Sequence, residues 1–233
     1  MGPVAPLPDT TVIIYMGTFA PQCAEVIYRP LARIFEARGY PVVMKSLPRL
    51  GLGPLDEASD ELALSTLSPD RRYILIGHSQ GGLHAFHLAR YYEHMILAVI
   101  GFGVPFHGTR LANFGTLLRM MPAVGTMAAH SRYLHELRED QTYQAENVYS
   151  MFSVLDELVV PWFASNVAGA HNIILAPRFL HPMLIRFGLR RSNGVELVDG
   201  WAEHIGVIWH PSLHHYIEYV LDQIEGRHSQ AVA

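Results

Sequence analysis

The sequence predicts an α/β domain with a mostly parallel central sheet and helices on both of its faces. Short apolar runs without a polar side alternate along the chain with stretches of helical periodicity. Strands that are apolar on both sides are typical of parallel sheets, which helices cover from either side. A chain of 233 residues that is 50% hydrophobic can bury one substantial core. We therefore expect residues 1–233 to form a single domain.

The expected strands are short, apolar and rich in β-branched residues. They lie within segments 11–16, 40–45, 73–77, 95–103, 147–156, 171–176 and 195–200. Pro41 weakens the second of them, because proline cannot donate a hydrogen bond to a sheet.

Helical periodicity marks stretches between the strands. One helix ends near Arg38, before Gly39, and Pro30 lies either in its first turn or at a kink in a longer helix. Further helices are expected over 56–66, 81–92 and 211–224. The last of these carries its apolar residues on one stripe.

Two segments, 109–147 and 176–192, follow no simple strand-helix rhythm. In an α/β domain such insertions usually lie above the carboxyl ends of the strands. We expect them to form a small lid or cap.

Composition excludes several classes of function. A formal net charge of -4 and an isoelectric point near 6.4 offer no basic face for nucleic acid. Cys23 is the only cysteine, so no intramolecular disulfide can form. No stretch approaches the roughly 20 apolar residues of a membrane span, and the N-terminus lacks the features of a signal peptide. We expect a cytoplasmic protein, or a secreted one if a leader has been removed.

The segment "YILIGHSQGG" places a serine at a tight turn between a strand and a helix. Residues 77–81 fit the pattern G-x-S-x-G. Such a serine has a strained backbone, and its glycine neighbours remove side chains that would collide. The turn holds the hydroxyl above the sheet edge and directs the first amides of the helix toward the same point. Ser79 is therefore the candidate nucleophile; the alternative is a glycine-rich turn whose serine only caps the helix.

A serine nucleophile needs a base, and the base needs an orienting acid. In this architecture they follow the serine in the order acid, then histidine. Asp156 is the acid candidate, because it follows a strand and precedes a turn that ends at Pro161. Glu157 is expected to point elsewhere, and Asp199 lies too close to the histidine in sequence to be preferred.

His204 is the candidate base, because it lies in a loop that directly follows strand segment 195–200. The other candidates are His210, His214 and His215, of which the last two fall on the final helix. A metal centre is disfavoured because the sequence has no HExxH motif and a single cysteine.

These residues resemble the α/β-hydrolase superfamily, in particular its bacterial lipase and esterase branch. Four stretches carry the resemblance, in the family's order and over nearly the whole chain. They are "GHSQGG" (77–82), "GVPFHGT" (103–109), "DELVVP" (156–161) and "EHIGVIWHPSLHHYI" (203–217).

The resemblance implies that Ser79 is the nucleophile, Asp156 the orienting acid and His204 the base. It also implies an oxyanion hole made by the backbone N–H of Gln80 and an amide from the loop after the first strand. The family usually has His-Gly in that loop, whereas this sequence has Met16-Gly17-Thr18. Thr18 is preferred as the second donor, with Phe19 as the alternative. The stretch 103–109 is interpreted as scaffold beneath the active site.

The implied reaction is hydrolysis of a carboxylic ester through an acyl-enzyme, without a cofactor or metal. Segment 111–130 is rich in leucine and methionine, which fits an acyl-chain pocket or lid as well as a helix packed on the core. Segment 181–191 is apolar and basic, and can touch a lipid interface or a neighbouring subunit. The predicted substrate is a hydrophobic acyl ester or lipid. The alternatives are a thioesterase, acyltransferase or perhydrolase with the same residues, or an inactive binding protein of this fold.

Overall fold

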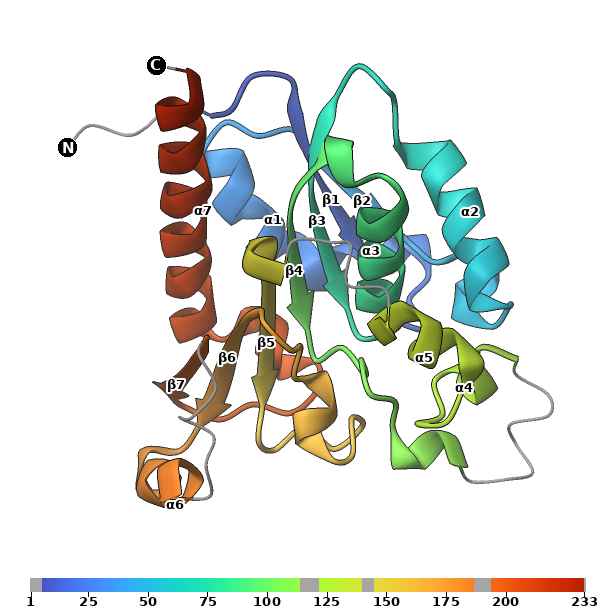
Figure 1. The fold of residues 1–233 in the computed structure, drawn as a ribbon, viewed down its shortest axis with the longest axis vertical. Helices are drawn as coiled ribbons and strands as arrows, with labels where there is room; N and C mark the ends of the chain where they lie inside the picture. The colour runs from blue at the N-terminus through green and yellow to red at the C-terminus, as the bar shows by residue number, and fades with distance from the viewer. Residues whose placement is uncertain (1–5, 114–121, 140–144, 187–193, 233) are drawn as a thin grey trace.

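The structure, a computed structural model, describes residues 6–113, 122–139, 145–186 and 194–232 (Figure 1). Its strands are β1 (Thr10–Tyr15), β2 (Val42–Lys45), β3 (Arg72–His78), β4 (Ile96–Phe102), β5 (Val148–Ser153), β6 (His171–Ala176) and β7 (Val195–Asp199). Its α-helices are α1 (Glu25–Ala37), α2 (Leu55–Thr66), α3 (Gln80–Tyr91), α4 (Pro122–Thr126), α5 (Arg132–Glu139), α6 (His181–Arg186) and α7 (Pro211–Val232).

The strands form one sheet in the order β2-β1-β3-β4-β5-β6-β7, and every neighbouring pair is parallel. The predicted α/β class with a mostly parallel sheet is thereby confirmed. All carboxyl ends meet at one edge, toward the bottom of Figure 1. Ligands of open α/β sheets bind outside this edge.

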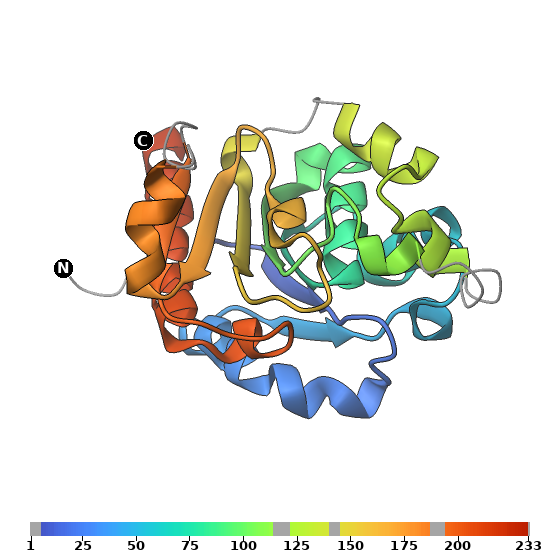
Figure 2. The ribbon, with the colours of Figure 1, turned by 90° about the horizontal axis from the view of Figure 1, so that it is seen from below.

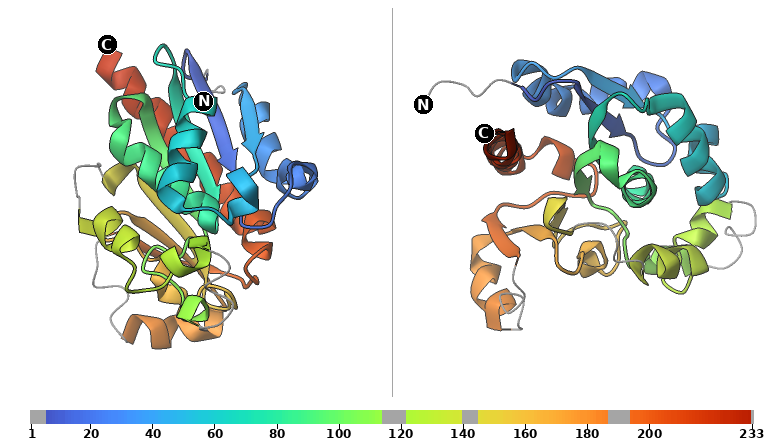
Figure 3. Two further views of the ribbon diagram at one scale, coloured as in Figure 1. Left: turned by 90° about the vertical axis from the view of Figure 1, so that its right-hand side faces the viewer. Right: turned by 45° about the horizontal axis from the view of Figure 1, so that its top comes forward.

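Helices cover both faces of the sheet, as the end-on view in Figure 2 and the side views in Figure 3 show. Helices α1 and α7 pack on one face, and α2, α3 and α5 pack on the other. Strand β1 shows why its sequence is apolar throughout. Val12 and Ile14 join the core cluster under α1 and α7, whereas Ile13 and Tyr15 join the cluster under α2 and α3.

Two prolines lie where the sequence left room for alternatives. Pro30 is inside α1, so the helix begins earlier than a proline-initiated first turn would place it. Pro41 precedes the edge strand β2, and its carbonyl still accepts the N–H of Val12 at 2.9 Å. Proline at the start of an edge strand removes no ladder donor that the sheet needs.

The two irregular segments follow β4 and β6. The described part of segment 109–147 contains α4 and α5, and Leu134 and Leu137 of α5 belong to the core cluster under α2 and α3. Segment 176–192 contributes α6. The expected lid lies partly in residues 114–121, 140–144 and 187–193, which are outside the described residues.

Burial shifts the pKa of His78 and His84, which are 5% and 0% exposed. Burial lowers the pKa of His84 from 6.5 to about 3, and burial together with nearby His204 lowers that of His78 equally. Between pH 6.5 and pH 3 the unfolded chain therefore binds more protons than the folded chain. Stability must fall as the pH falls through this window.

Substituting His84 tests this acid sensitivity. Between pH 7 and pH 5, each such histidine lowers the free energy of unfolding by about 2 kcal/mol. We expect His84→Leu to reduce, by about that amount, the loss in the free energy of unfolding that urea denaturation measures between pH 7 and pH 5. Leucine also removes Nε2 of His84, a buried atom that has no hydrogen-bond partner in the described part of the chain. The control is His215→Gln, whose side chain is 89% exposed. An equal loss in wild type and His84→Leu would contradict the prediction.

Candidate active site

Ser79 occupies the turn between β3 and α3, at the carboxyl edge of the sheet. Its φ of 54° and ψ of −127° lie in a region that costs a non-glycine residue about 1–3 kcal/mol. The surrounding backbone holds this conformation. Ser79 N–H donates to Phe102 O at 2.8 Å, and Ser79 O accepts Gly82 N–H at 3.0 Å. The side chain is half-buried, within reach of solvent.

Gly77, Gly81 and Gly82 each lie so close to other atoms of the chain that a side chain would collide with them. A Cβ at Gly77 would lie 2.3 Å from Gly82 Cα, within the turn itself. A Cβ at Gly81 would lie 2.3 Å from Tyr15 O, and one at Gly82 would lie 2.1 Å from Val104 Cγ2. The motif thus lets α3 pack against the end of β1 and against the segment after β4.

Two backbone amides near Ser79 are free to donate. Gln80 N–H is the first amide of α3, and neither it nor Thr18 N–H has a hydrogen-bond partner among the described residues. Phe19 N–H, in contrast, donates to Leu50 O at 2.9 Å. Thr18 Oγ1 also donates to Gln80 Oε1 at 2.5 Å, which ties the two loops together. Of the two candidates in the β1 loop, only Thr18 has an available amide.

Asp156 and His204 form a buried pair. His204 Nδ1 and Asp156 Oδ2 are 2.8 Å apart, and both residues are at most 5% exposed. The other carboxylate oxygen, Oδ1, accepts the N–H groups of Leu158 at 3.0 Å and Val159 at 2.8 Å. These two amides fix the carboxylate, and the carboxylate in turn fixes the imidazole.

The backbone of His204 is held as firmly as its ring. Its N–H donates to Glu157 Oε2 at 2.9 Å, and its carbonyl lies 3.1 Å from His78 Nε2. Nε2 is therefore the polar atom of His204 that has no partner among the described residues. His204 Nε2 forms no hydrogen bond to Ser79 Oγ in this structure. Ser79 Oγ also has no hydrogen-bond partner among the described residues. Such catalytic contacts are often long before substrate binds.

Segment 103–109 supports this arrangement from β4. Gly103 has a φ of +53°, and a Cβ there would lie 2.9 Å from Asp156 Oδ2 and 3.1 Å from His204 Nδ1. Thr109 Oγ1 donates to Leu158 O at 2.8 Å and accepts Val160 N–H at 3.2 Å. The segment therefore braces the loop that carries Asp156.

This architecture is similar to that of several solved structures. No protein family and no curated protein matches the sequence itself. A structure of the metagenome-derived lipolytic enzymes LipS and LipT aligns with 97% of this chain and 99% of its own, at 12% identity and a TM-score of 0.57. The monoacylglycerol lipase of Paleococcus ferrophilus aligns over 93% of this chain and 94% of its own, at 12% identity and a TM-score of 0.56.

Aspergillus fumigatus lipase B is 21% identical over 66% of this chain, at a TM-score of 0.54, and the match spans 39% of the lipase. Mouse alpha/beta hydrolase domain-containing protein 10 aligns over 93% of this chain at a TM-score of 0.51. The chain has the α/β-hydrolase fold. At these identities the likeness concerns the fold, and the chemistry has to be argued from the residues.

The remaining sequence candidates lie outside the Asp156–His204 pair of this α/β-hydrolase fold. His210 packs against Gly200, where a Cβ would lie 2.6 Å from His210 Nε2. His214 Nε2 contacts Ile208 O at 2.7 Å, and His215 lies beside Glu218 at 3.9 Å. Asp199 accepts the N–H of Arg178 at 2.9 Å.

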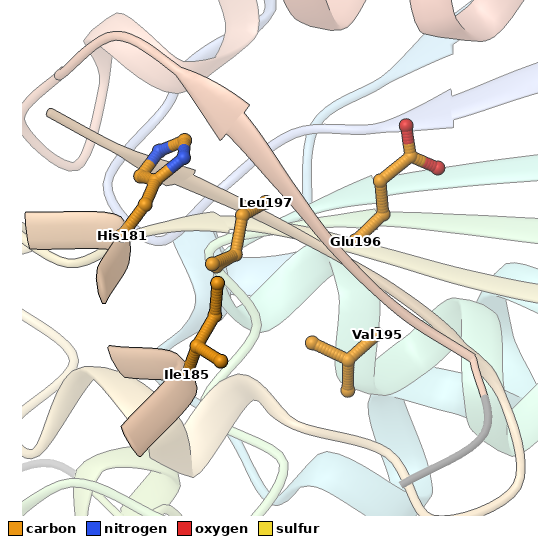
Figure 4. Close-up of a pocket in the computed structure, with 5 residues that line it drawn as sticks. All are labelled: His181, Ile185, Val195, Glu196 and Leu197. Carbon is orange, nitrogen blue, oxygen red and sulfur yellow. The ribbon is translucent and has the colours of Figure 1, made fainter. Parts of the chain in front are cut away.

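A pocket of about 230 Å³ lies at the far edge of the sheet, between α6 and β7. Figure 4 shows Ile185 and Leu197 turned toward each other in it, with Glu196 directed away. β7 is four strands from β3, or about 19 Å at the usual spacing. The pocket contains none of the predicted site residues.

Two other kinds of site are absent from the described part of the chain. No group of three or more His, Cys, Asp or Glu side chains there is arranged to hold a metal ion. Within those same residues, none of the helices combines the length and hydropathy that crossing a bilayer requires.

Sequence reasoning missed three residues that contact the site. Glu157 accepts the N–H of His204, although it was expected to point elsewhere. His78 and Tyr28 lie beneath the site and form a hydrogen bond of 2.9 Å to each other. His78 belongs to the G-x-S-x-G motif, which gave a signal that could have been followed. Tyr28 lies on α1, and nothing in its local sequence points to the site.

Proposed function

We propose that the chain is a serine hydrolase that cleaves carboxylic esters of hydrophobic acyl chains, as a lipase or carboxylesterase. Ser79 is the nucleophile, His204 the base and Asp156 the orienting acid. The observation that carries this proposal is the state of His204. Its Nδ1, N–H and carbonyl are all engaged, and Nε2 alone is left to accept a proton at the edge where Ser79 lies.

The reaction follows from these positions. His204 Nε2 takes the proton of Ser79 Oγ as Oγ attacks the ester carbonyl carbon, and the carbonyl oxygen becomes an oxyanion. The amides of Thr18 and Gln80 donate to that oxygen. The C–O bond then breaks, His204 returns the proton to the leaving alcohol, and an acyl-enzyme remains. Water activated by His204 releases the acid and regenerates Ser79.

A hydrophobic acyl chain is favoured by the apolar side chains exposed along the carboxyl edge of the sheet. Most exposed large hydrophobic side chains of the described residues lie on segments that follow strand carboxyl ends. They are Phe19, Leu50, Leu111, Leu155, Leu158, Phe163, Phe179, Met183, Ile185, Trp201, Ile205 and Trp209. Concentration of apolar side chains at one end of a molecule indicates contact with apolar ligands or a lipid surface.

Covalent labelling combined with an ester series tests the proposal. A fluorophosphonate should form one adduct, which mass spectrometry locates on Ser79. Hydrolysis of p-nitrophenyl esters from acetyl to palmitoyl should show an optimum longer than acetyl. The corresponding acyl thioesters, run in parallel, distinguish a thioesterase by a higher kcat/KM. A chain that is neither labelled nor active on either series would be a binding protein of this fold.

A further inference from the structure

A buried chain of hydrogen bonds runs beneath the site from the β1 loop to the base. Gly17 N–H donates to Tyr28 Oη at 3.0 Å, and Tyr28 Oη is 2.9 Å from His78 Nδ1. His78 Nε2 is 3.1 Å from the carbonyl oxygen of His204. Tyr28, His78 and His204 are 3%, 5% and 3% exposed, so water does not compete with these bonds.

Each bond in this chain can run in only one direction. The carbonyl of His204 can only accept, so a neutral His78 carries its single proton on Nε2 and donates it there. His78 Nδ1 is then an acceptor. Tyr28 Oη therefore donates its own proton to Nδ1 and accepts the N–H of Gly17, because an amide can only donate. All four groups are satisfied, and one tautomer of His78 is selected.

The two ends of the chain lie on different parts of the proposed machinery. Gly17 directly precedes Thr18, whose amide is the proposed second oxyanion donor. The other end fixes the main chain of His204, the proposed base. A Cβ at Gly17 would lie 3.0 Å from His78 Nδ1 and 3.5 Å from Ser79 Cβ, so the β1 loop lies directly against the nucleophile turn.

We infer that Tyr28 and His78 are positioning residues, which set the Thr18 amide and the His204 imidazole relative to Ser79 through this hydrogen-bond chain. The inference rests on the proposed function. Beyond that function, the inference links the proposed oxyanion hole to the proposed base through the hydrogen bonds of Tyr28 and His78.

The environment of His78 keeps the link uncharged. Burial, followed by proximity to His204, lowers the pKa of His78 to about 3. The two rings lie 4.8 Å apart at 41°, so a charged His78 would oppose the positive charge that His204 acquires when it takes the serine proton. A neutral imidazole can donate to the carbonyl of His204 without that cost.

Tyr28→Phe removes the central hydroxyl and keeps the ring. Gly17 N–H then loses its acceptor, and His78 Nδ1 loses the donor that selects its tautomer. Misplacing an oxyanion donor costs rate without weakening substrate binding. We expect kcat for p-nitrophenyl esters to fall about 10- to 30-fold with KM within about twofold. The affinity of a trifluoromethyl ketone, which mimics the tetrahedral intermediate, should fall in parallel.

Tyr40→Phe is a closely matched control. Tyr40 is 2% exposed in the same core cluster, and its hydroxyl accepts Leu7 N–H at 3.2 Å and donates to Glu225 Oε1 at 2.9 Å. It therefore makes the same kinds of bond without contacting the site. We expect Tyr40→Phe to lower stability to a similar extent and to leave kcat within about twofold of wild type. Equal effects of the two variants on kcat would overturn the inference.

Nuclear magnetic resonance of the wild-type histidines gives a measurement that needs no variant. With ¹⁵N-labelled histidine, His78 should be neutral at pH 7 with its proton on Nε2. A proton on Nδ1, or a charged ring, would overturn the inference. If wild type hydrolyses esters and only the Tyr28 result fails, the positioning role alone is wrong. If the wild-type protein neither hydrolyses esters nor is labelled at Ser79, both the proposed function and the positioning role are wrong.

Discussion

Ser79→Ala is expected to lower kcat for p-nitrophenyl esters by about 10⁴- to 10⁶-fold. The hydroxyl oxygen is the atom that bonds to the acyl carbon, and alanine provides no replacement. Alanine keeps the Cβ, so the backbone strain at a φ of 54° is unchanged and the free energy of unfolding should stay near that of wild type. Initial rates, urea denaturation and fluorophosphonate labelling measure the three consequences.

Two further substitutions separate chemistry from folding. Ser65→Ala removes a hydroxyl on α2 that donates to Leu62 O, and its kcat should match wild type. Ser79→Gly should be as inactive as Ser79→Ala and about 1 kcal/mol more stable, because glycine adopts positive φ without strain. Retained turnover or labelling in Ser79→Ala would show that another residue is the nucleophile.

The fold was predictable because its strands are buried on both sides. Residues 12–15 alternate between the two core clusters, so every one of them must be apolar. The expected helix of 211–224 extends to Val232 as α7. Its final turns are more polar than the stripe of Leu213, Ile217 and Leu221, so periodicity gave no signal there. Helix ends depend on local capping and contacts that an apolar pattern does not encode.

The candidate site was predictable to the extent that local motifs carry it. Ser79 and Gln80 lie in one turn, and Asp156 lies in the loop that follows β5, so sequence position alone brings them to the carboxyl edge. The sequence does not show that Leu50 O accepts the Phe19 N–H, which is the observation that favours Thr18 in the proposal. Contacts between elements far apart in sequence decide such questions.

The supporting residues illustrate the same limit more strongly. Tyr28 is 50 residues from His78, and His78 is 126 residues from His204. Each looks like an ordinary buried aromatic residue when read alone. Only the packing of α1 against β3 and against the loop after β7 reveals the shared hydrogen bonds. Glu157 is next to Asp156 in the sequence, and only the turn that follows β5 shows that its carboxylate reaches His204 N–H.

Asp156→Asn is expected to lower kcat by about 10⁴-fold while preserving the fold. The amide is nearly the same size as the carboxylate, but one of its two ends is now a donor. The carbonyl end is required by the N–H groups of Leu158 and Val159, which contact Oδ1 at 3.0 and 2.8 Å. The NH₂ end must then face His204 Nδ1, which becomes an acceptor. The ring proton moves to Nε2, and His204 can no longer accept the proton of Ser79.

Asp199→Asn provides the matched control, because it makes the same chemical change at the other acid candidate. Asp199 Oδ1 accepts the N–H of Arg178, which an amide oxygen can also accept, so kcat should remain within about twofold of wild type. ¹⁵N spectra of the histidines test the mechanism directly, since Asp156→Asn should move the proton of neutral His204 from Nδ1 to Nε2. A large loss of activity in Asp199→Asn, with Asp156→Asn near wild type, would assign the orienting acid to the end of β7. A large loss of activity in Asp156→Asn alone, together with the change of tautomer, would attribute the loss of rate to the proton on His204 Nε2. The N–H groups of Leu158 and Val159 force that proton onto Nε2, because they fix the orientation of the amide that replaces the Asp156 carboxylate.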